Sequence, residues 1–122
     1  MLRSLTIALP FLAAATAAQA AGDTKAGADV FKKCAMCHTA NKGGSNGLGP
    51  NLFGIVGRKA GTLNDFQYSG KLKTSGIVWT PDNLTRWVAR PAALVPGTKM
   101  SFAGISSKNQ QANLVAYLQT LK

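Results

Sequence analysis

The chain has 122 residues, enough for one domain of ordinary size, and it carries a formal net charge of +10. A field of that sign attracts acidic partners and raises the rate at which they meet the protein. The sequence contains only two cysteines, three positions apart, so no disulfide framework closes its loops. A small Gly-rich domain usually needs a disulfide or a bound cofactor to be stable. Without disulfides, a bound cofactor is the remaining way to stabilise it.

The first 20 residues are typical of a secretory signal. Arg3 precedes an apolar run from Leu5 to Ala18, and Ala18-Gln19-Ala20 fits the small-x-small cleavage pattern. The run is shorter than the roughly 20 apolar residues of a membrane-spanning helix, and an uncleaved membrane anchor is the alternative. We expect cleavage of residues 1–20, a mature domain over residues 21–122, a periplasmic location and no stable membrane insertion.

Nucleic acid is the other common partner of a basic protein. The lysines of this chain are scattered between Lys25 and Lys122 and do not form one run. An exported protein also rarely meets nucleic acid. We therefore expect no nucleic-acid binding, and we expect the protein to be a monomer.

The first two helices are predicted from apolar periodicity and capping residues. One runs from Asp23 to about Met36, and Asp23 or Thr24 is placed to cap its start. The next runs from Thr80 to Arg90, with a proline at the first helical position. Pro91 follows and stops this helix, because proline cannot continue it.

The third main helix is predicted over Ser107 to Leu121, where Ser107 and Gln110 form a capping box. Residues Gly70 to Ser75 fit one short helix closed by Gly76. The remainder is loop, notably the Gly-rich stretch from Thr39 to Asn64, and such a long loop in a compact domain usually binds something. The sequence thus predicts an all-α fold, with three main helices, one short helix and long loops wrapped around a ligand.

The segment Cys34-Ala35-Met36-Cys37-His38 is a C-x-x-C-H motif, which indicates covalent attachment of haem c. Two residues between the cysteines present both thiols to neighbouring vinyl groups, and His38 is then carried under the ring to the iron. A thioredoxin-like motif would need a βαβ pattern, and a zinc site would need four ligands where three candidates occur. A disulfide across two residues would be strained.

The sixth ligand of the iron follows by elimination. His38 is the only histidine, so a thioether is the best remaining soft donor for haem iron. Met36 lies inside the attachment motif and cannot reach the opposite face, whereas Met100 follows a Pro-Gly bend in a distant loop. We predict Met100 as the ligand, with gap-filling in the core as its alternative role. Ligation by Met and His suits a carrier that cycles between ferrous and ferric iron.

Further motifs follow in the same order and spacing as in a known family. They are Gly27, Phe31, Cys34 to Thr39, Lys42-Gly43-Gly44, Gly49-Pro50-Asn51-Leu52, Gly57-Arg58-Lys59-Ala60-Gly61, Tyr68-Ser69, Gly76-Ile77, Trp79, Pro91, Pro96 to Met100 and Ala116-Tyr117-Leu118. With them the mature chain resembles class I cytochrome c, the mitochondrial type and its bacterial relatives, over its whole length. The resemblance implies the cytochrome c fold around one covalent haem.

The resemblance also implies roles for residues around the haem. The Pro50 carbonyl accepts the Nδ1–H of His38, which fixes the tautomer of the ligand. Arg58, Tyr68 and Trp79 bond the inner haem propionate, and Thr98 bonds the other one. It implies as well that Gly27 and Phe31 meet Leu114 and Tyr117 where the first and last helices cross.

Several positions depart from the mitochondrial pattern. Trp87 stands where a tyrosine usually donates to the Met sulfur, and Leu72 where an asparagine usually holds a buried water. Losing a donor lowers the potential and a more apolar pocket raises it, so the net effect stays open. Asn46 replaces a loop-bridging histidine. Ala92 and Ala93 replace two lysines of the docking surface, which leaves Lys33, Lys42, Lys71, Lys73 and Lys99 for a basic ring around the haem edge.

We therefore expect a diffusible one-electron carrier of a respiratory or photosynthetic chain, and not an enzyme. Its partners would be redox proteins with acidic docking patches. A quinol-oxidising complex would be the donor, and an oxidase, a peroxidase or a photosynthetic centre the acceptor. Two alternatives remain: an enzyme or sensor that uses an open iron, which requires that Met100 not be bound, and a fixed subunit of a larger complex.

Overall fold

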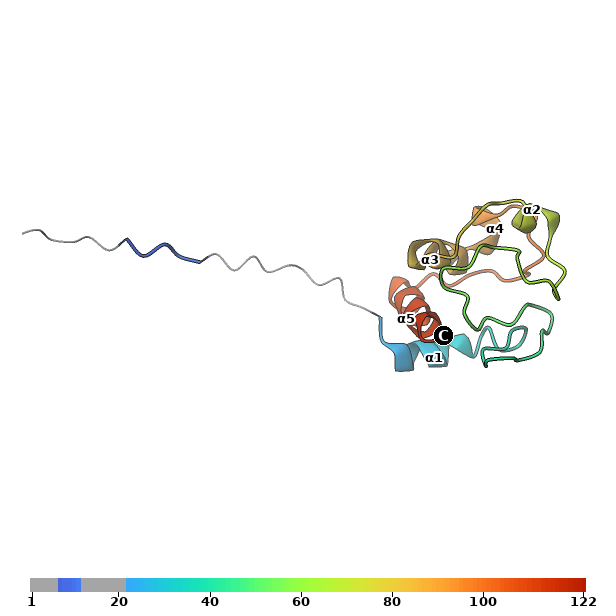
Figure 1. The fold of residues 1–122 in the computed structure, drawn as a ribbon, viewed down its shortest axis with the longest axis horizontal. Helices are drawn as coiled ribbons and strands as arrows, with labels where there is room; N and C mark the ends of the chain where they lie inside the picture. The colour runs from blue at the N-terminus through green and yellow to red at the C-terminus, as the bar shows by residue number, and fades with distance from the viewer. Residues whose placement is uncertain (1–6, 12–21) are drawn as a thin grey trace, which may run out of the picture.

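The structure is a computed structural model that describes residues 7–11 and 22–122. Most of the predicted signal segment lies outside these residues. In the described part there are five helices and no strand, namely α1 (Thr24–Phe31), α2 (Gly70–Lys73), α3 (Pro81–Ala89), α4 (Pro91–Leu94) and α5 (Lys108–Gln119) (Figure 1). One isolated antiparallel β-bridge joins Lys59 to Val78. The all-α prediction is therefore confirmed. No helix within the described ranges is long and apolar enough to cross a membrane.

Helix α1 begins as predicted and ends earlier. The Asp23 side chain accepts hydrogen bonds from the backbone N–H groups of Lys25 and Ala26 at 2.9 and 3.0 Å. After Phe31 the backbone tightens into successive turns. The N–H of Cys34 donates to the Phe31 carbonyl at 2.7 Å, and that of Cys37 to the Cys34 carbonyl at 3.0 Å. These three-residue hydrogen bonds carry the attachment motif off the end of the helix.

Capping residues also start the later helices. The Thr80 hydroxyl accepts from the Asn83 N–H at 3.1 Å, and the Ser107 hydroxyl from the Gln110 N–H at 3.2 Å. Pro91 stops α3 as predicted, but it also begins α4, which was not predicted. The reason is that the fixed φ of proline suits the first position of a helix as well as it breaks the helix before it.

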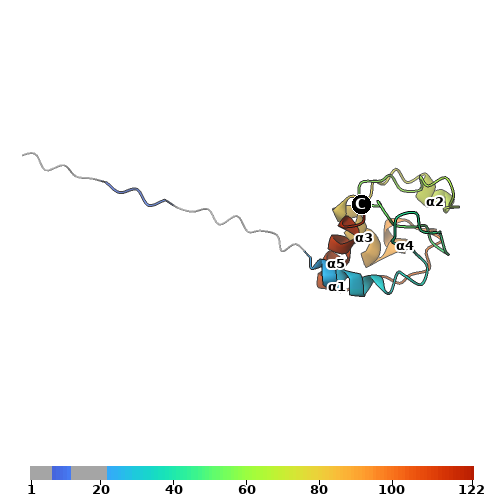
Figure 2. The ribbon, with the colours of Figure 1, turned by 60° about the horizontal axis from the view of Figure 1, so that its bottom comes forward.

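Helices α1 and α5 cross at close range (Figures 1 and 2). A Cβ added at Gly27 would lie 2.6 Å from the carbonyl carbon of Asn113 and 2.8 Å from the Cβ of Tyr117, so only glycine fits there. The rings of Phe31 and Tyr117 pack with centroids 5.3 Å apart. The predicted meeting of the first and last helices is thus confirmed.

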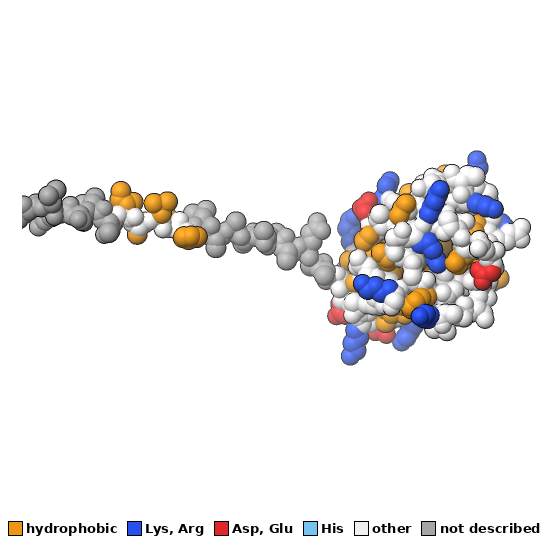
Figure 3. Space-filling view, in the orientation of Figure 1, with side chains coloured by type: hydrophobic (Ala, Val, Ile, Leu, Met, Phe, Trp, Pro, Cys, Tyr) orange, Lys and Arg blue, Asp and Glu red, His pale blue; other side chains and the backbone are white. Residues whose placement is uncertain are grey.

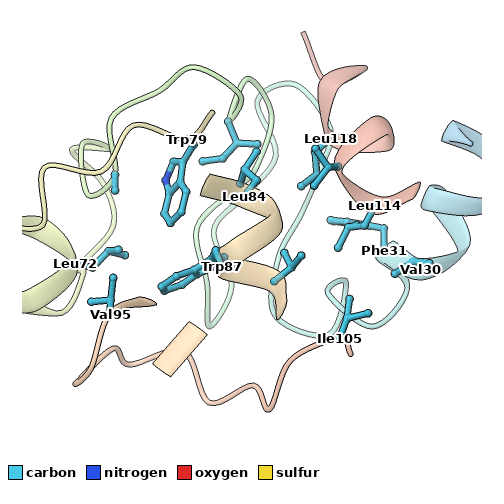
Figure 4. Close-up of a cluster of buried hydrophobic side chains, with 14 residues drawn as sticks. Val30, Phe31, Leu72, Trp79, Leu84, Trp87, Val95, Ile105, Leu114 and Leu118 are labelled. Carbon is cyan, nitrogen blue, oxygen red and sulfur yellow. The ribbon is translucent and has the colours of Figure 1, made fainter. Parts of the chain in front are cut away.

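The buried apolar side chains come from helices α1, α2, α3 and α5 and from the loops between them (Figure 4). Trp87 on α3 lies beside Trp79, with ring centroids 5.2 Å apart and planes at 60°. Leu114 and Leu118 of α5 face them from the other side of Leu84. These side chains form one wall of the site described below.

The Gly-rich stretch between α1 and α2 contains no helix, as predicted. Its far end is fastened to the segment before α3, where Gly57 N–H donates to the Trp79 carbonyl at 2.8 Å and Trp79 N–H returns a bond to the Arg58 carbonyl at 2.9 Å. Gly54 N–H donates to the Leu121 carbonyl at 2.7 Å. The second half of the loop is therefore held against the segment before α3 and the chain after α5.

Candidate haem-binding site

A cavity of about 710 Å³ lies between the long loop and helices α3 and α5. This volume is within the range of ligand and cofactor pockets, roughly 300–1,000 Å³. All nine predicted site residues line it, namely Cys34, Cys37, His38, Pro50, Arg58, Tyr68, Trp79, Thr98 and Met100. The structure thus brings together residues spread over the sequence from Cys34 to Met100. Their roles toward a haem stay predictions.

The two thiols of the attachment motif lie at the edge of this cavity and are not joined to each other. Cys34 is half-buried, and Cys37 is exposed. Burial raises the pKa of the Cys34 thiol to about 11, although nearby Lys33 opposes the shift. Cys34 is therefore an uncharged thiol at neutral pH, which matches the uncharged thioether that attachment would make of it.

The His38 ring is held at one nitrogen and seated on one glycine. Its Nδ1 donates to the Pro50 carbonyl oxygen at 2.7 Å. A Cβ at Gly49 would lie 2.7 Å from Nδ1 and 2.8 Å from Nε2, so the ring occupies the space that any side chain at Gly49 would need. Burial lowers the pKa of His38, with the Pro50 hydrogen bond opposing part of the shift. A neutral ring that donates from Nδ1 keeps its lone pair on Nε2, the form that binds iron.

Met100 lies on a loop whose backbone is well tied. Gly97 adopts a left-handed φ of 86°, and this bend is followed by a hydrogen bond from the Thr98 N–H to the Val95 carbonyl at 3.1 Å. The Thr98 hydroxyl then accepts from the Met100 N–H at 3.2 Å. The half-buried Met100 is therefore held by Thr98, a contact that the sequence analysis did not anticipate.

The hydrogen-bond donors along the cavity wall also fit a ligand with carboxylate groups. In the described part of the chain, every side-chain polar atom that solvent cannot reach has a partner. Trp79 and Trp87 line the cavity and are buried, and neither indole N–H has an acceptor among the described residues. A buried indole N–H needs an acceptor. For Trp79, a carboxylate of a bound haem would supply one.

Arg58 and Tyr68 lie on the same wall. The Arg58 guanidinium makes one long bond, 3.4 Å from its Nη2 to the Asn51 carbonyl, and keeps other donors free. The Tyr68 hydroxyl accepts from the Leu63 N–H at 3.2 Å, which leaves its own proton to donate. The residues of the cavity therefore fit a covalently held haem. The thiols could attach it, His38 and Met100 could bind its iron, and Arg58 and Tyr68 still have hydrogen-bond donors for its carboxylates.

Two functional residues were missed or only partly understood from the sequence. Gly49 was noted within a motif, but its role under the His38 ring needs the folded loop. Asn46 stands in place of a bridging histidine, and its amide still joins two parts of the stretch between α1 and α2 through bonds to Asn51 and Asp65. The only sequence signal that the His38 ring packs against Gly49 is the Gly49-Pro50 pair.

The rim of the cavity is basic with an apolar centre. Lys33, Lys59 and Lys99 line its mouth. Met36 and Leu48, also at the mouth, are 85% and 86% exposed. Lys and Arg side chains are spread over the face shown in Figure 3, with apolar side chains between them.

Comparisons with known proteins agree with this geometry. The family model for cytochrome c matches residues 24–122. The cytochrome c of Theileria annulata is 52% identical over 99 residues, 80% of this chain and 85% of that protein. Cytochrome c2 of Blastochloris viridis is 42% identical over 118 residues, 97% of this chain and 93% of that protein. The structure of cytochrome cH from Methylobacterium extorquens, 44% identical, superimposes with a TM-score of 0.76 and covers 81% of this chain and 99% of that one. The chain therefore belongs to the class I cytochrome c family, whose members bind haem c covalently and carry electrons.

Proposed function

We propose that this cytochrome c is an exported one-electron carrier of a respiratory or photosynthetic chain, with His38 and Met100 as the two axial ligands of its haem. The observation that carries the proposal is that Cys34, Cys37, His38 and Met100 line one largely apolar cavity. Bound haem supplies reversible exchange of one electron between ferrous and ferric iron. The residues of the chain hold it, set its ligands and limit its contact with water.

The two proposed ligand residues are each tied by a hydrogen bond. The His38 ring is oriented by the Pro50 carbonyl, and the backbone N–H of Met100 is held by the Thr98 hydroxyl. With both residues bound to iron, no position would stay open for peroxide or a gas. This supports a carrier over an enzyme or sensor, because an enzyme would need one position free.

Electron exchange needs a close encounter at the exposed edge of the cofactor. The lysines at the cavity mouth attract an acidic patch, and the exposed Met36 and Leu48 between them give an apolar contact. Charge steering of this kind raises the association rate more than the affinity, so the complex forms fast and also separates. Such partners would be a quinol-oxidising complex as donor and an oxidase, a peroxidase or a photosynthetic centre as acceptor.

Export is the remaining part of the proposal. The charged start, apolar run and Ala18-Gln19-Ala20 site support a cleaved signal over residues 1–20 and a periplasmic location. Covalent attachment suits that location, because an exported protein in dilute surroundings keeps a cofactor that it cannot lose by dissociation.

The ligand assignment is tested by comparing Met100→Ala with Met36→Ala. Met100→Ala should keep its covalent haem but lose the red-edge absorption band of Met-to-ferric-iron ligation, and its reduced form should bind carbon monoxide rapidly. Met36→Ala removes the exposed thioether of the attachment motif and should keep the absorption band and the slow carbon monoxide binding of the unchanged protein. Survival of the band in Met100→Ala would refute the assignment. Rapid carbon monoxide binding by the unchanged protein would favour an enzyme or sensor.

A further inference from the structure

The side-chain amide of Asn46 joins two parts of the long stretch between α1 and α2. Its Nδ2 donates to the Asp65 carbonyl oxygen at 3.1 Å, and its Oδ1 accepts from the Asn51 backbone N–H at 2.8 Å. Asp65 stands next to Phe66, which lines the cavity as Tyr68 does. One planar amide thus holds together segments that are 19 residues apart.

The bond to Asn51 has a direct path to His38. The Asn51 N–H and the Pro50 carbonyl belong to the same planar peptide group. Asn46 holds the N–H end of that group at 2.8 Å, and His38 Nδ1 donates to its carbonyl end at 2.7 Å. The orientation of this one peptide plane therefore sets the direction in which the His38 ring is held.

The other contacts of this segment do not fix the same plane. The Asn51 side chain donates to the Thr39 hydroxyl and to the Asn41 carbonyl, and accepts from the Phe53 N–H. These bonds anchor the side chain and the residues around it. The peptide group can still tilt about the single bonds on either side, and Asn46 is the partner that its N–H meets.

We propose that Asn46 is a positioning residue for His38, acting through the Pro50–Asn51 peptide group. This proposal rests on the proposed role of His38 as the iron ligand. Hydrogen bonds in a chain polarise one another, so the bond from Asn51 makes the Pro50 carbonyl a better acceptor. A stronger bond to Nδ1–H makes the imidazole a stronger donor to iron, which favours the ferric state.

The asparagine amide suits this role better than an aspartate or a histidine would. It offers one donor and one acceptor, and both are used. Aspartate would keep the acceptor for the Asn51 N–H but would place a carboxylate oxygen against the Asp65 carbonyl. A histidine, as the family resemblance implies at this position, would titrate near neutral pH, whereas an amide holds the same link at any pH in that range.

The test uses the holoprotein with Asn46→Ala, Asn46→Asp and, as a matched control, Asn64→Ala. Asn64 is an exposed loop asparagine next to Asp65 whose side chain bonds no described residue. Two quantities are measured: the solvent exchange rate of the His38 Nδ1 proton by NMR of the reduced protein, and the mid-point potential. Asn46→Ala should speed the exchange at least tenfold. It should also shift the ferric–ferrous equilibrium twofold to tenfold toward ferrous, which is about 20–60 mV for one electron.

The two other variants separate a positioning role from a structural one. Asn46→Asp keeps the acceptor for the Asn51 N–H, so its exchange rate should stay within about twofold of the unchanged protein. Asn64→Ala should change neither quantity. A lower melting temperature in Asn46→Ala with both quantities unchanged would overturn the proposal, as would fast exchange in Asn46→Asp. If the unchanged holoprotein shows no haem ring-current shift at the His38 ring, the ligand assignment itself fails.

Discussion

The seat of the His38 ring on Gly49 gives the sharpest test of the site geometry. In Gly49→Ala the added Cβ would lie 2.7 Å from Nδ1 and 2.8 Å from Nε2 of that ring. The backbone cannot easily retreat, since Gly49 N–H donates to the Cys37 carbonyl and its own carbonyl accepts from Gly47, both at 2.9 Å. The ring must therefore move, and its bond to Pro50 must weaken.

The expected loss of stability combines two effects. Overpacking of a well-packed site costs about 1–3 kcal/mol, and a weakened hydrogen bond adds about 0.5–1.5 kcal/mol. A domain of this size loses roughly 4–8 °C in melting temperature per kcal/mol. We therefore expect Gly49→Ala holoprotein to melt at least about 6 °C lower, with an altered His38 signature in its spectrum.

The assay is thermal unfolding of the holoprotein, followed by far-UV circular dichroism and haem absorbance. Gly70→Ala is the matched control, because a Cβ there meets nothing within 4 Å and the residue begins α2. Alanine in a helix should leave the melting temperature unchanged or raise it. A Gly49→Ala protein that melts and absorbs like the unchanged protein would show that the His38 ring does not lie against Gly49.

Three further predictions concern the helix crossing, the attachment and the docking. Gly27→Ala should lower the free energy of unfolding by about 1–3 kcal/mol, because its Cβ would lie 2.6 Å from the Asn113 carbonyl carbon; an unchanged denaturant midpoint would contradict this crossing. Cys37→Ser should sharply reduce the yield of stable holoprotein, measured by haem absorbance, and a normal yield would count against a second thioether. Electron transfer with an acidic partner should slow as ionic strength rises, because the Debye length falls from about 10 Å at 0.1 M to 3 Å at 1 M; salt-independent rates would remove the role of the lysines.

The helices were predictable because their signals are local. The caps at Asp23, Thr80 and Ser107 act within three residues of themselves, so a short window of sequence contains both partners. The end of α1 and the existence of α4 were not predictable in this way. The end of α1 depends on the turns that carry the attachment motif away from the helix, and a proline such as Pro91 is equally suited to ending one helix and beginning the next.

The site residues also fall into two groups, those with a local sequence signal and those without one. The motif around Cys34, Cys37 and His38 is visible because attachment chemistry fixes its spacing, and Met100 followed by elimination. The bond from Asn46 to Asp65 and the seat on Gly49 pair residues through a loop with no regular period. Such contacts depend on how the backbone folds, so they cannot be predicted from a pattern of residue types.

The central cavity has a consequence for the order of events in the life of this protein. About 710 Å³ of largely apolar space opens to solvent between the long loop and helices α3 and α5. The side chains that line it gain packing partners when a cofactor is bound, and a ligand that binds the folded form and not the unfolded chain stabilises the fold. We therefore expect haem attachment and formation of this architecture to be coupled, so that the chain without its cofactor unfolds more easily and is digested faster by proteases.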